Sequence, residues 1–238
     1  LGPYHPWIAP RAINLGRTYQ QFDRIVEAEE LLRVALDQDR HIYGESHQYV
    51  ASSLQNLAIL IYNEKDKTEG MQLIEQGLAI EEQAIGKEHI NTNQTRALLA
   101  SYYTEAGLYD EAEALLDEAE VVFRSSFDND HIYLADLAKF RGQLYVATER
   151  AELAVAELTS SAAMFERLFD SDSERLPEVL ISLADAYSTI GESENAISAY
   201  SRGLSILENG NKATDEHYKR LEELKSASST LPEQAISN

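Results

Sequence analysis

Histidine is the residue type whose spacing in this chain first suggests chemistry, because imidazole nitrogens bind metals and carry protons. Four of the six histidines recur every 42 residues, at His5, His47, His89 and His131. One period corresponds to one structural unit, roughly the 10 Å diameter of a helix, whereas zinc ligands lie about 2 Å from their ion. Histidines at equivalent positions therefore cannot share a metal. We expect them to belong to the connectors between units, with no metal site.

Other short motifs are too incomplete for catalysis or cofactor binding. Gly86-Lys87 is followed by Glu88, where a phosphate-binding loop requires serine or threonine. Residues 170–174 resemble a calcium loop but lack the glycine that turns the chain. No nucleophile elbow, zincin helix or dinucleotide-binding glycine turn occurs. We therefore expect no catalytic residue and no cofactor, and predict that the chain is not an enzyme.

The composition disfavours several classes of partner. A net charge of −21 over 238 residues repels nucleic-acid phosphates and anionic lipid head groups. No cysteine is present, which excludes disulfides and fits a reducing, cytoplasmic compartment. No apolar run approaches the roughly 18 residues of a membrane-spanning helix. We expect a protein or peptide partner, with neither nucleic acid nor a membrane.

The negative charge is concentrated in residues 101–130, where Arg124 is the only basic residue. One interpretation is a solvated helix face that keeps the protein soluble. The other is a landing surface for a basic peptide. The sequence leaves both interpretations open.

The 42-residue period continues into the helices that must position these connectors. Leu180, Leu183, Ala184 and Tyr187 fall at i, i+3, i+4 and i+7, which is the apolar stripe of an amphipathic helix. Gly191 can end this helix, and a second apolar stripe follows it. Each unit is therefore predicted to be a helical hairpin. A fixed period of this length is typical of a solenoid, in which each unit packs on its neighbours.

Three positions of the period hold only small residues, the types needed where two helix backbones approach closely. Glycine within a helix costs about 1 kcal/mol relative to alanine, so its repeated use favours a packing role. We expect close backbone contact at all three positions. The three rows are Gly16, Ala58, Ala100, Gly142 and Ala184; Ala28, Gly70, Ala112, Ala154 and Ala196; and Ala35, Gly77, Ala119, Ser161 and Gly203.

One connector position is occupied by Gly2, Gly44, Gly86, Asp128 and Asp170. Glycine, and less readily aspartate, tolerates the left-handed conformation that closes a helix. We therefore predict that conformation at the end of each second helix.

Several segments together resemble a known repeat. They are the connector at residues 1–6 (Leu-Gly-Pro-Tyr-His-Pro), Asn14-Leu15-Gly16, Asn56-Leu57-Ala58, and residues 109–113 (Tyr-Asp-Glu-Ala-Glu). The pattern, over roughly residues 1–210, resembles the tetratricopeptide repeat in the 42-residue form of kinesin light chains. This resemblance implies a right-handed superhelix whose first helices line a concave, peptide-holding face.

We predict an all-α fold, an α-α superhelix (a right-handed solenoid) of five helical hairpins and a C-terminal capping helix. The hairpins are expected at residues 5–46, 47–88, 89–130, 131–172 and 173–214. A capping helix at 215–227 would complete a single solenoid domain, 1–227. Residues 228–238 lack periodicity and should form a flexible tail. Because Leu1-Gly2 resembles the end of an earlier unit, we expect further repeats or a domain upstream, and an exposed apolar edge at the N-terminal end.

The resemblance implies a groove lined by first-helix residues that face away from the second helices. By their place in the period, the candidates are Arg17, Gln20, Gln55, Ile59, Tyr62, Asn63, Ser101, Thr104, Lys139, Gln143, Ile181 and Asp185. Trp7, Tyr49 and Tyr133 would form an aromatic ladder along one rim, which either packs on neighbouring helix ends or offers an amphipathic strip to a ligand. The carboxylate clamp of some tetratricopeptide domains is not matched, because only Asn56 fits among Ile13, Arg17, Asn56, Gln94 and Leu98.

The sequence thus predicts a non-catalytic protein–protein interaction module, a cytoplasmic scaffold that binds a peptide or protein segment in its groove. The alternative is a regulatory or sensor arm of a larger signalling protein, such as a bacterial serine/threonine kinase or a protease. Arg17 and Lys139 are the only cations expected in the groove. We therefore expect basic or apolar peptides and binding that weakens with salt.

Overall fold

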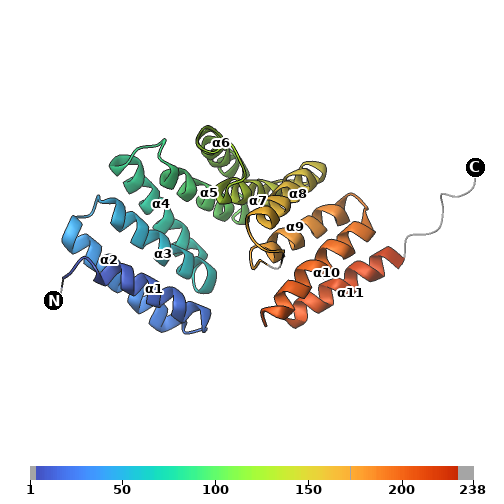
Figure 1. The fold of residues 1–238 in the computed structure, drawn as a ribbon, viewed down its shortest axis with the longest axis horizontal. Coiled ribbons are helices and arrows are strands. Elements are labelled where there is room, and N and C mark those ends of the chain that lie inside the picture. Colours follow the sequence, from blue (N-terminus) through green and yellow to red (C-terminus); the bar gives the residue numbers. More distant parts are fainter. Residues whose placement is uncertain (1–3, 172, 230–238) are drawn as a thin grey trace, which may run out of the picture. The chain divides into compact units, whose positions relative to one another are not determined.

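The computed structural model describes residues 4–171 and 173–229 of the chain. These residues form eleven α-helices and no strand (Figure 1), which confirms the predicted all-α fold. None of these helices is long and apolar enough to cross a membrane. The helices are α1 Ile8–Gln21, α2 Ile25–Tyr43, α3 Gln48–Glu64, α4 Lys67–Ala84, α5 Ile90–Glu105, α6 Tyr109–Ser126, α7 Ile132–Ala147, α8 Ala151–Leu168, α9 Leu176–Thr189, α10 Ser193–Asn209 and α11 Asp215–Ser229.

The chain divides within α5 into two compact units. Unit 1 extends to Tyr102 and unit 2 begins at Tyr103. In unit 1, α1 packs on α2, α2 on α3 and α3 on α4 (Figure 1). In unit 2, each helix from α6 to α11 packs on the next along the chain. Neighbours in sequence are thus neighbours in space, as expected for a solenoid.

The helix after the fifth hairpin is α11, which packs on α10. It includes residues 228 and 229, the first two residues of the predicted tail. The rest of that predicted tail, residues 230–238, lies outside the described residues.

The small residues of all three rows are buried. The backbone of another helix approaches Gly16, Gly70, Gly77 and Gly203 closely, whereas a Cβ at Gly142 would meet the side chain of Leu158. A Cβ added to Gly16 would lie 3.2 Å from the carbonyl oxygen of Ala28. Ser161 Oγ, in the third row, donates a hydrogen bond to the carbonyl oxygen of Ala135 at 2.8 Å. The predicted close contact between backbones is confirmed at Gly16, Gly70, Gly77, Ser161 and Gly203 and is wrong at Gly142.

Larger apolar side chains fill the space between these contacts. Leu32, Ile74, Leu116 and Leu158 occupy one position of the period, and all four are fully buried. Burying a side chain of this size contributes roughly 2 kcal/mol to stability. Each hairpin therefore gains a fixed apolar layer from the same position of the sequence.

The connectors end the second helices in two different ways. Gly44 and Gly86 have φ angles of 81° and 95°, the left-handed conformation predicted for them. The prediction is wrong for Asp128 and Asp170, which do not have positive φ. The helices before them, α6 and α8, end at Ser126 and Leu168, and the cap residues Phe127 and Phe169 have extended backbone. Extended backbone avoids the steric cost of a side chain in the left-handed region. Gly2 lies outside the described residues.

The connector histidines accept hydrogen bonds from the backbone at or just before the start of the first helices, and His47 and His131 are the N-caps of α3 and α7. His47 Nδ1 and His131 Nδ1 each accept a hydrogen bond, at 3.2 Å, from the backbone N–H two residues later. His5 and His89 do the same at 3.3 and 3.1 Å. Ser173 takes the equivalent role before α9. These side chains satisfy N–H groups that have no partner within the helix, so the repeated histidine has a structural role.

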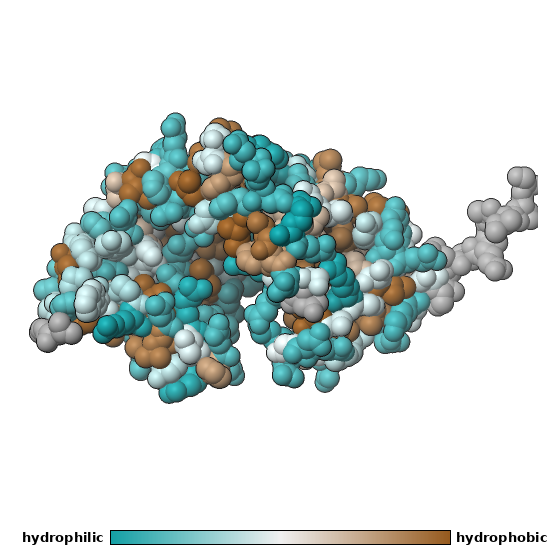
Figure 2. Space-filling model, in the orientation of Figure 1, coloured by the Kyte–Doolittle hydropathy of each residue, from teal (hydrophilic) through white to brown (hydrophobic). Residues whose placement is uncertain are grey.

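The N-terminal end of unit 1 carries the expected apolar edge. Leu15 is 43% exposed, whereas the leucines at the same position of later repeats, Leu57, Leu99 and Leu183, are buried. On the face shown in Figure 2, hydrophilic residues predominate and apolar residues form separate patches.

Replacing Gly70 by alanine tests the small-residue packing in α4. A Cβ at Gly70 would lie 2.7 Å from the Cα of Tyr62, which cannot move without moving α3. We expect Gly70→Ala to lower the free energy of unfolding by about 2 kcal/mol, measured by urea denaturation.

Gly77→Ala is the matched control in the same helix. Its Cβ would meet nothing closer than 3.4 Å, so the substitution should leave stability unchanged or raise it by up to about 1 kcal/mol. Equal effects of the two substitutions would contradict the packing described above.

Candidate functional site

Unit 1 contains two adjoining cavities, which are lined mainly by its first helices. The first, of about 560 Å³, is lined by Trp7, Arg17, Asp39, Tyr43, Tyr49 and Asn56, together with neighbouring residues. The second, of about 420 Å³, is lined by Arg17, Gln20, Gln21, Gln55, Asn56, Ile59 and Gln94. Because Arg17 and Asn56 line both, the cavities form one depression, which we call the unit 1 groove.

The first cavity, which we call the aromatic cavity, combines exposed rings with a buried acid. Trp7 is 61% exposed and Tyr49 is 48% exposed. Tyr43 and Tyr49 lie with ring centroids 4.9 Å apart at an interplanar angle of 69°. Asp39 is only 5% exposed, and its Oδ2 accepts a hydrogen bond from Ser53 Oγ at 2.6 Å. Burial raises the pKa of Asp39, although the Ser53 hydroxyl and the charge of His47 act in the opposite direction.

The second cavity, which we call the amide cavity, is lined by side-chain amides. Among the described residues, the side chains of Gln20, Gln55 and Gln94 have no hydrogen-bond partner, and Arg17 forms no ion pair. Each amide offers two donor hydrogens and an acceptor oxygen. Together with the apolar Ile59, these groups can bind the backbone of an extended peptide. Arg17, Gln20, Gln55 and Ile59 are among the predicted groove residues, whereas Gln21, Asn56 and Gln94 also line the cavity and were not predicted for the groove.

The predicted groove residues of unit 2 are occupied by contacts within the protein. Glu178 accepts hydrogen bonds from Lys139 and Gln143, both at 2.9 Å. Asp185 accepts one from Arg220 at 2.7 Å, and Ile181 packs against the apolar core. The charge of Lys139 is therefore neutralised by Glu178 from the next hairpin.

The remaining predicted groove residues lie on α3 and α5. Tyr62 is buried, and its ring stacks on Tyr102 with centroids 3.6 Å apart. Thr104 is also buried, and Ser101 Oγ donates to the carbonyl oxygen of Leu98. Asn63 is exposed. Because their side chains do not reach the surface, Tyr62 and Thr104 play no part in the groove that we describe.

The three predicted rim aromatics differ in environment. Tyr133 is half-buried, and its ring lies 5.4 Å from the ring of Phe123 and 4.9 Å from that of His131. Trp7 and Tyr49 are exposed and line the aromatic cavity. Tyr133 thus packs on a neighbouring helix end, while Trp7 and Tyr49 remain accessible.

Unit 2 also contains a cavity, of about 760 Å³, beside the connector between α6 and α7. Two of its charged lining residues, Asp130 and Arg124, are already paired. Asp130 forms an ion pair with Arg167, and Arg124 forms one with Glu120. This cavity therefore offers fewer free groups to a ligand than the unit 1 groove does.

The acidic residues of α6 contribute to packing between helices. Glu113 accepts a hydrogen bond from Arg150 at 2.8 Å, and Arg141 lies 3.0 and 2.8 Å from Asp117 and Glu120. Arginines of the following hairpin thus neutralise part of the acidic stretch. This arrangement favours a structural role over a landing surface for a basic peptide.

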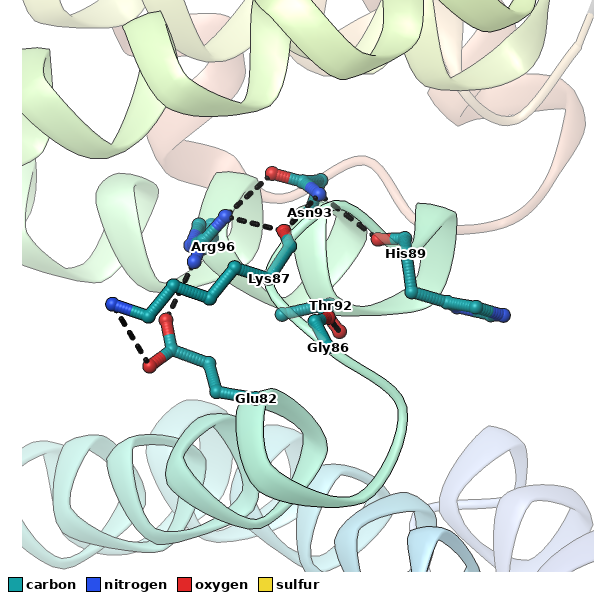
Figure 3. A network of polar contacts seen from close by, with 7 residues as sticks. All are labelled: Glu82, Gly86, Lys87, His89, Thr92, Asn93 and Arg96. Atoms are coloured by element: carbon teal, nitrogen blue, oxygen red, sulfur yellow. Dashed lines mark hydrogen bonds and ion pairs between the residues drawn. The ribbon is translucent and has the colours of Figure 1, made fainter.

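A buried polar network holds the connector between α4 and α5 (Figure 3). Arg96, only 3% exposed, donates to the carbonyl oxygen of Lys87 and to Asn93 Oδ1, both at 2.8 Å, and to Glu82 Oε1 at 2.5 Å. Asn93 Nδ2 donates to the carbonyl oxygens of Lys87 and His89. Alanine or leucine occupies the position of Arg96 in the other units. The network joins one connector to its own two helices.

The described residues contain no group of three or more histidine, aspartate or glutamate side chains that could hold a metal ion.

Comparison with protein families identifies the repeat. Residues 50–91, 91–167 and 133–209 match models of the tetratricopeptide repeat. The chain belongs to the tetratricopeptide repeat family. This result confirms the resemblance on which the helix pairs and the groove were predicted.

Similar solved structures support the fold. Solved structures include nearly identical repeats named as a kinesin light chain of Podosopora anserina, 22% identical with a TM-score of 0.66, covering 89% of this chain and all of that one. A Rap protein complexed with Competence and Sporulation Factor is 19% identical with a TM-score of 0.72, covering 92% of this chain and 60% of that one.

A longer relative also matches in sequence. The clustered mitochondria protein homologue of Danio rerio is 25% identical over 194 residues, which is 82% of this chain. The chain spans 14% of that relative's length.

Replacing Arg96 by methionine tests the buried network. The substitution keeps much of the side-chain volume but leaves Glu82, Asn93 and the Lys87 carbonyl with one partner fewer. We expect the free energy of unfolding to fall by about 2–3 kcal/mol, measured by urea denaturation.

Arg124→Met is the control, because Arg124 is 69% exposed and pairs only along the helix surface with Glu120. That change should stay within about 0.5 kcal/mol. A loss at Arg96 no larger than the loss at Arg124 would contradict the role of the network.

Proposed function

We propose that the chain is a non-catalytic interaction module and that the unit 1 groove binds an extended segment of a partner protein. The observation that carries this proposal is the set of unpaired amides of Gln20, Gln55 and Gln94 along one cavity. An extended peptide has main-chain N–H and C=O groups that lose water on binding, so each needs a partner. Side-chain amides provide both donors and acceptors, whatever the peptide sequence.

The charge of the protein favours basic or apolar peptides. The net charge is −21, which attracts cations over long distances. Of the two cations predicted for the groove, Lys139 is engaged by Glu178, while Arg17 forms no ion pair with a described residue. An acidic peptide would find little to balance its charge in unit 1.

The place of action that best fits these features is the cytoplasm, with neither nucleic acid nor a membrane as partner. The Rap protein complexed with Competence and Sporulation Factor shows that a protein of this fold forms a complex. A second candidate function is a regulatory arm of a larger signalling protein, such as a kinase or a protease. The observation that favours it is the greater length of the clustered mitochondria homologue. The same groove would then bind the regulating segment.

Selection from a random peptide library tests the proposal. We expect the selected peptides to be basic or apolar, and their affinity, measured by fluorescence anisotropy, to fall as salt is raised. The double substitution Gln55→Ala with Ile59→Ser should weaken binding by about tenfold, because it removes an amide and an apolar contact.

Gln72→Ala is the control, because Gln72 is exposed on α4, a second helix. It should leave the affinity unchanged. Selected peptides that are mainly acidic, or equal effects of the control and the double substitution, would rule out binding in this groove.

A further inference from the structure

The aromatic cavity of the unit 1 groove is lined by a carboxylate, and one oxygen of this carboxylate accepts no hydrogen bond from a described residue. Asp39 lies on α2 and is 5% exposed, yet it lines the cavity. Its Oδ2 accepts from Ser53, while its Oδ1 has no hydrogen-bond partner among the described residues. A buried carboxylate without a cation is costly, and burial accordingly raises the pKa of Asp39.

The walls of the same cavity suit a positive charge. Trp7, Tyr43 and Tyr49 all line it, and the negative faces of aromatic rings attract cations. The Arg11 guanidinium already lies 5.5 Å from the ring centre of Trp7. Planar guanidinium groups stack on such rings more readily than the compact ammonium group of lysine.

We propose that the aromatic cavity is a subsite for one cationic side chain of the bound peptide, preferably arginine, whose charge pairs with Asp39 between Trp7, Tyr43 and Tyr49. This inference rests on the proposed function, because it assigns one residue of the peptide to one end of the groove. The amide cavity binds the peptide main chain without regard to sequence. The aromatic cavity adds the preference for a basic residue.

Arg17 does not compete for Asp39 in this arrangement. It lines both cavities and therefore marks their junction. A peptide that passes from one cavity to the other presents main-chain carbonyl oxygens there, and a guanidinium donates to such oxygens. The peptide would thus meet a cation at the junction and an anion in the aromatic cavity.

Trp7 is the only tryptophan of the chain, so its fluorescence reports on the aromatic cavity directly. The probes are N-acetyl-arginine methylamide and N-acetyl-citrulline methylamide, which have nearly the same shape but differ by one charge. Titrating the full chain with each probe should change the Trp7 emission. We expect arginine to bind at least tenfold more tightly than citrulline.

Asp39→Asn removes the charge and keeps an acceptor for Ser53. This variant should bind the two probes equally. Asp37→Asn is the matched control, because Asp37 is exposed on the same helix and the loss of net charge is the same. It should keep the preference for arginine. Tyr49→Leu, at an exposed position, provides a second variant and should lower the preference about threefold.

Three outcomes overturn the subsite: equal binding of the two probes to the unchanged protein, a preference that survives Asp39→Asn, or no response of Trp7 to either probe. None of them affects the proposed function, provided that library peptides still bind and Gln55→Ala with Ile59→Ser still weakens them. If library peptides fail to bind at all while the arginine probe binds, the proposed function fails and the cation site remains.

Discussion

Close contact between helix backbones is the constraint on which the rest of this structure depends. It recurs at three positions of a 42-residue period, and every residue there is glycine, alanine or serine. Because no side chain separates the helices, their spacing and rotation are fixed by the backbone itself. That rotation decides which residues of α1 and α3 face the groove. The amide cavity is therefore a consequence of Gly16, Ala58 and their equivalents, although neither Gly16 nor Ala58 lines it.

Polar contacts fix the ends of the helices, where apolar packing is weakest. His47, His89 and His131 accept hydrogen bonds from the first turns of α3, α5 and α7, and His5 and Ser173 make the same contact with the backbone just before α1 and α9. In the third repeat, Arg96 and Asn93 stand where other repeats have apolar residues, and both donate hydrogen bonds to the Lys87 carbonyl oxygen of the connector. Arginines of unit 2 pair with acids of the preceding hairpin, as Arg150 does with Glu113. These pairs join neighbouring hairpins, while the apolar layers supply most of the stability.

The sequence was sufficient for those features that depend on local period. Helix pairs and most small-residue contacts follow from position within one repeat, and the proposal of Arg17, Gln20, Gln55 and Ile59 as groove residues rests on the same reasoning. The sequence was insufficient where two side chains that touch belong to neighbouring repeats. Lys139 meets Glu178, 39 residues later, and Tyr62 meets Tyr102, 40 residues later. The period aligns equivalent positions but does not show which side chains from different units touch. Asp39 was not among the predicted groove residues, because only first helices were expected to line the groove. Asp39 lies on a second helix and reaches the groove between two first helices.

A disulfide formed across one backbone contact tests the central claim most directly, since the chain contains no cysteine of its own. A Cβ at Gly77 would lie 3.9 Å from the Cα of Ala51, and disulfides join residues whose Cα atoms are about 4.4–6.8 Å apart. Cysteines introduced at positions 51 and 77 should therefore form an intramolecular disulfide on mild oxidation, as measured by mass spectrometry. Cysteines at 51 and 79, where Ala79 is exposed, should not. Equal yields from both pairs would contradict the contact between helix backbones from which the groove is built.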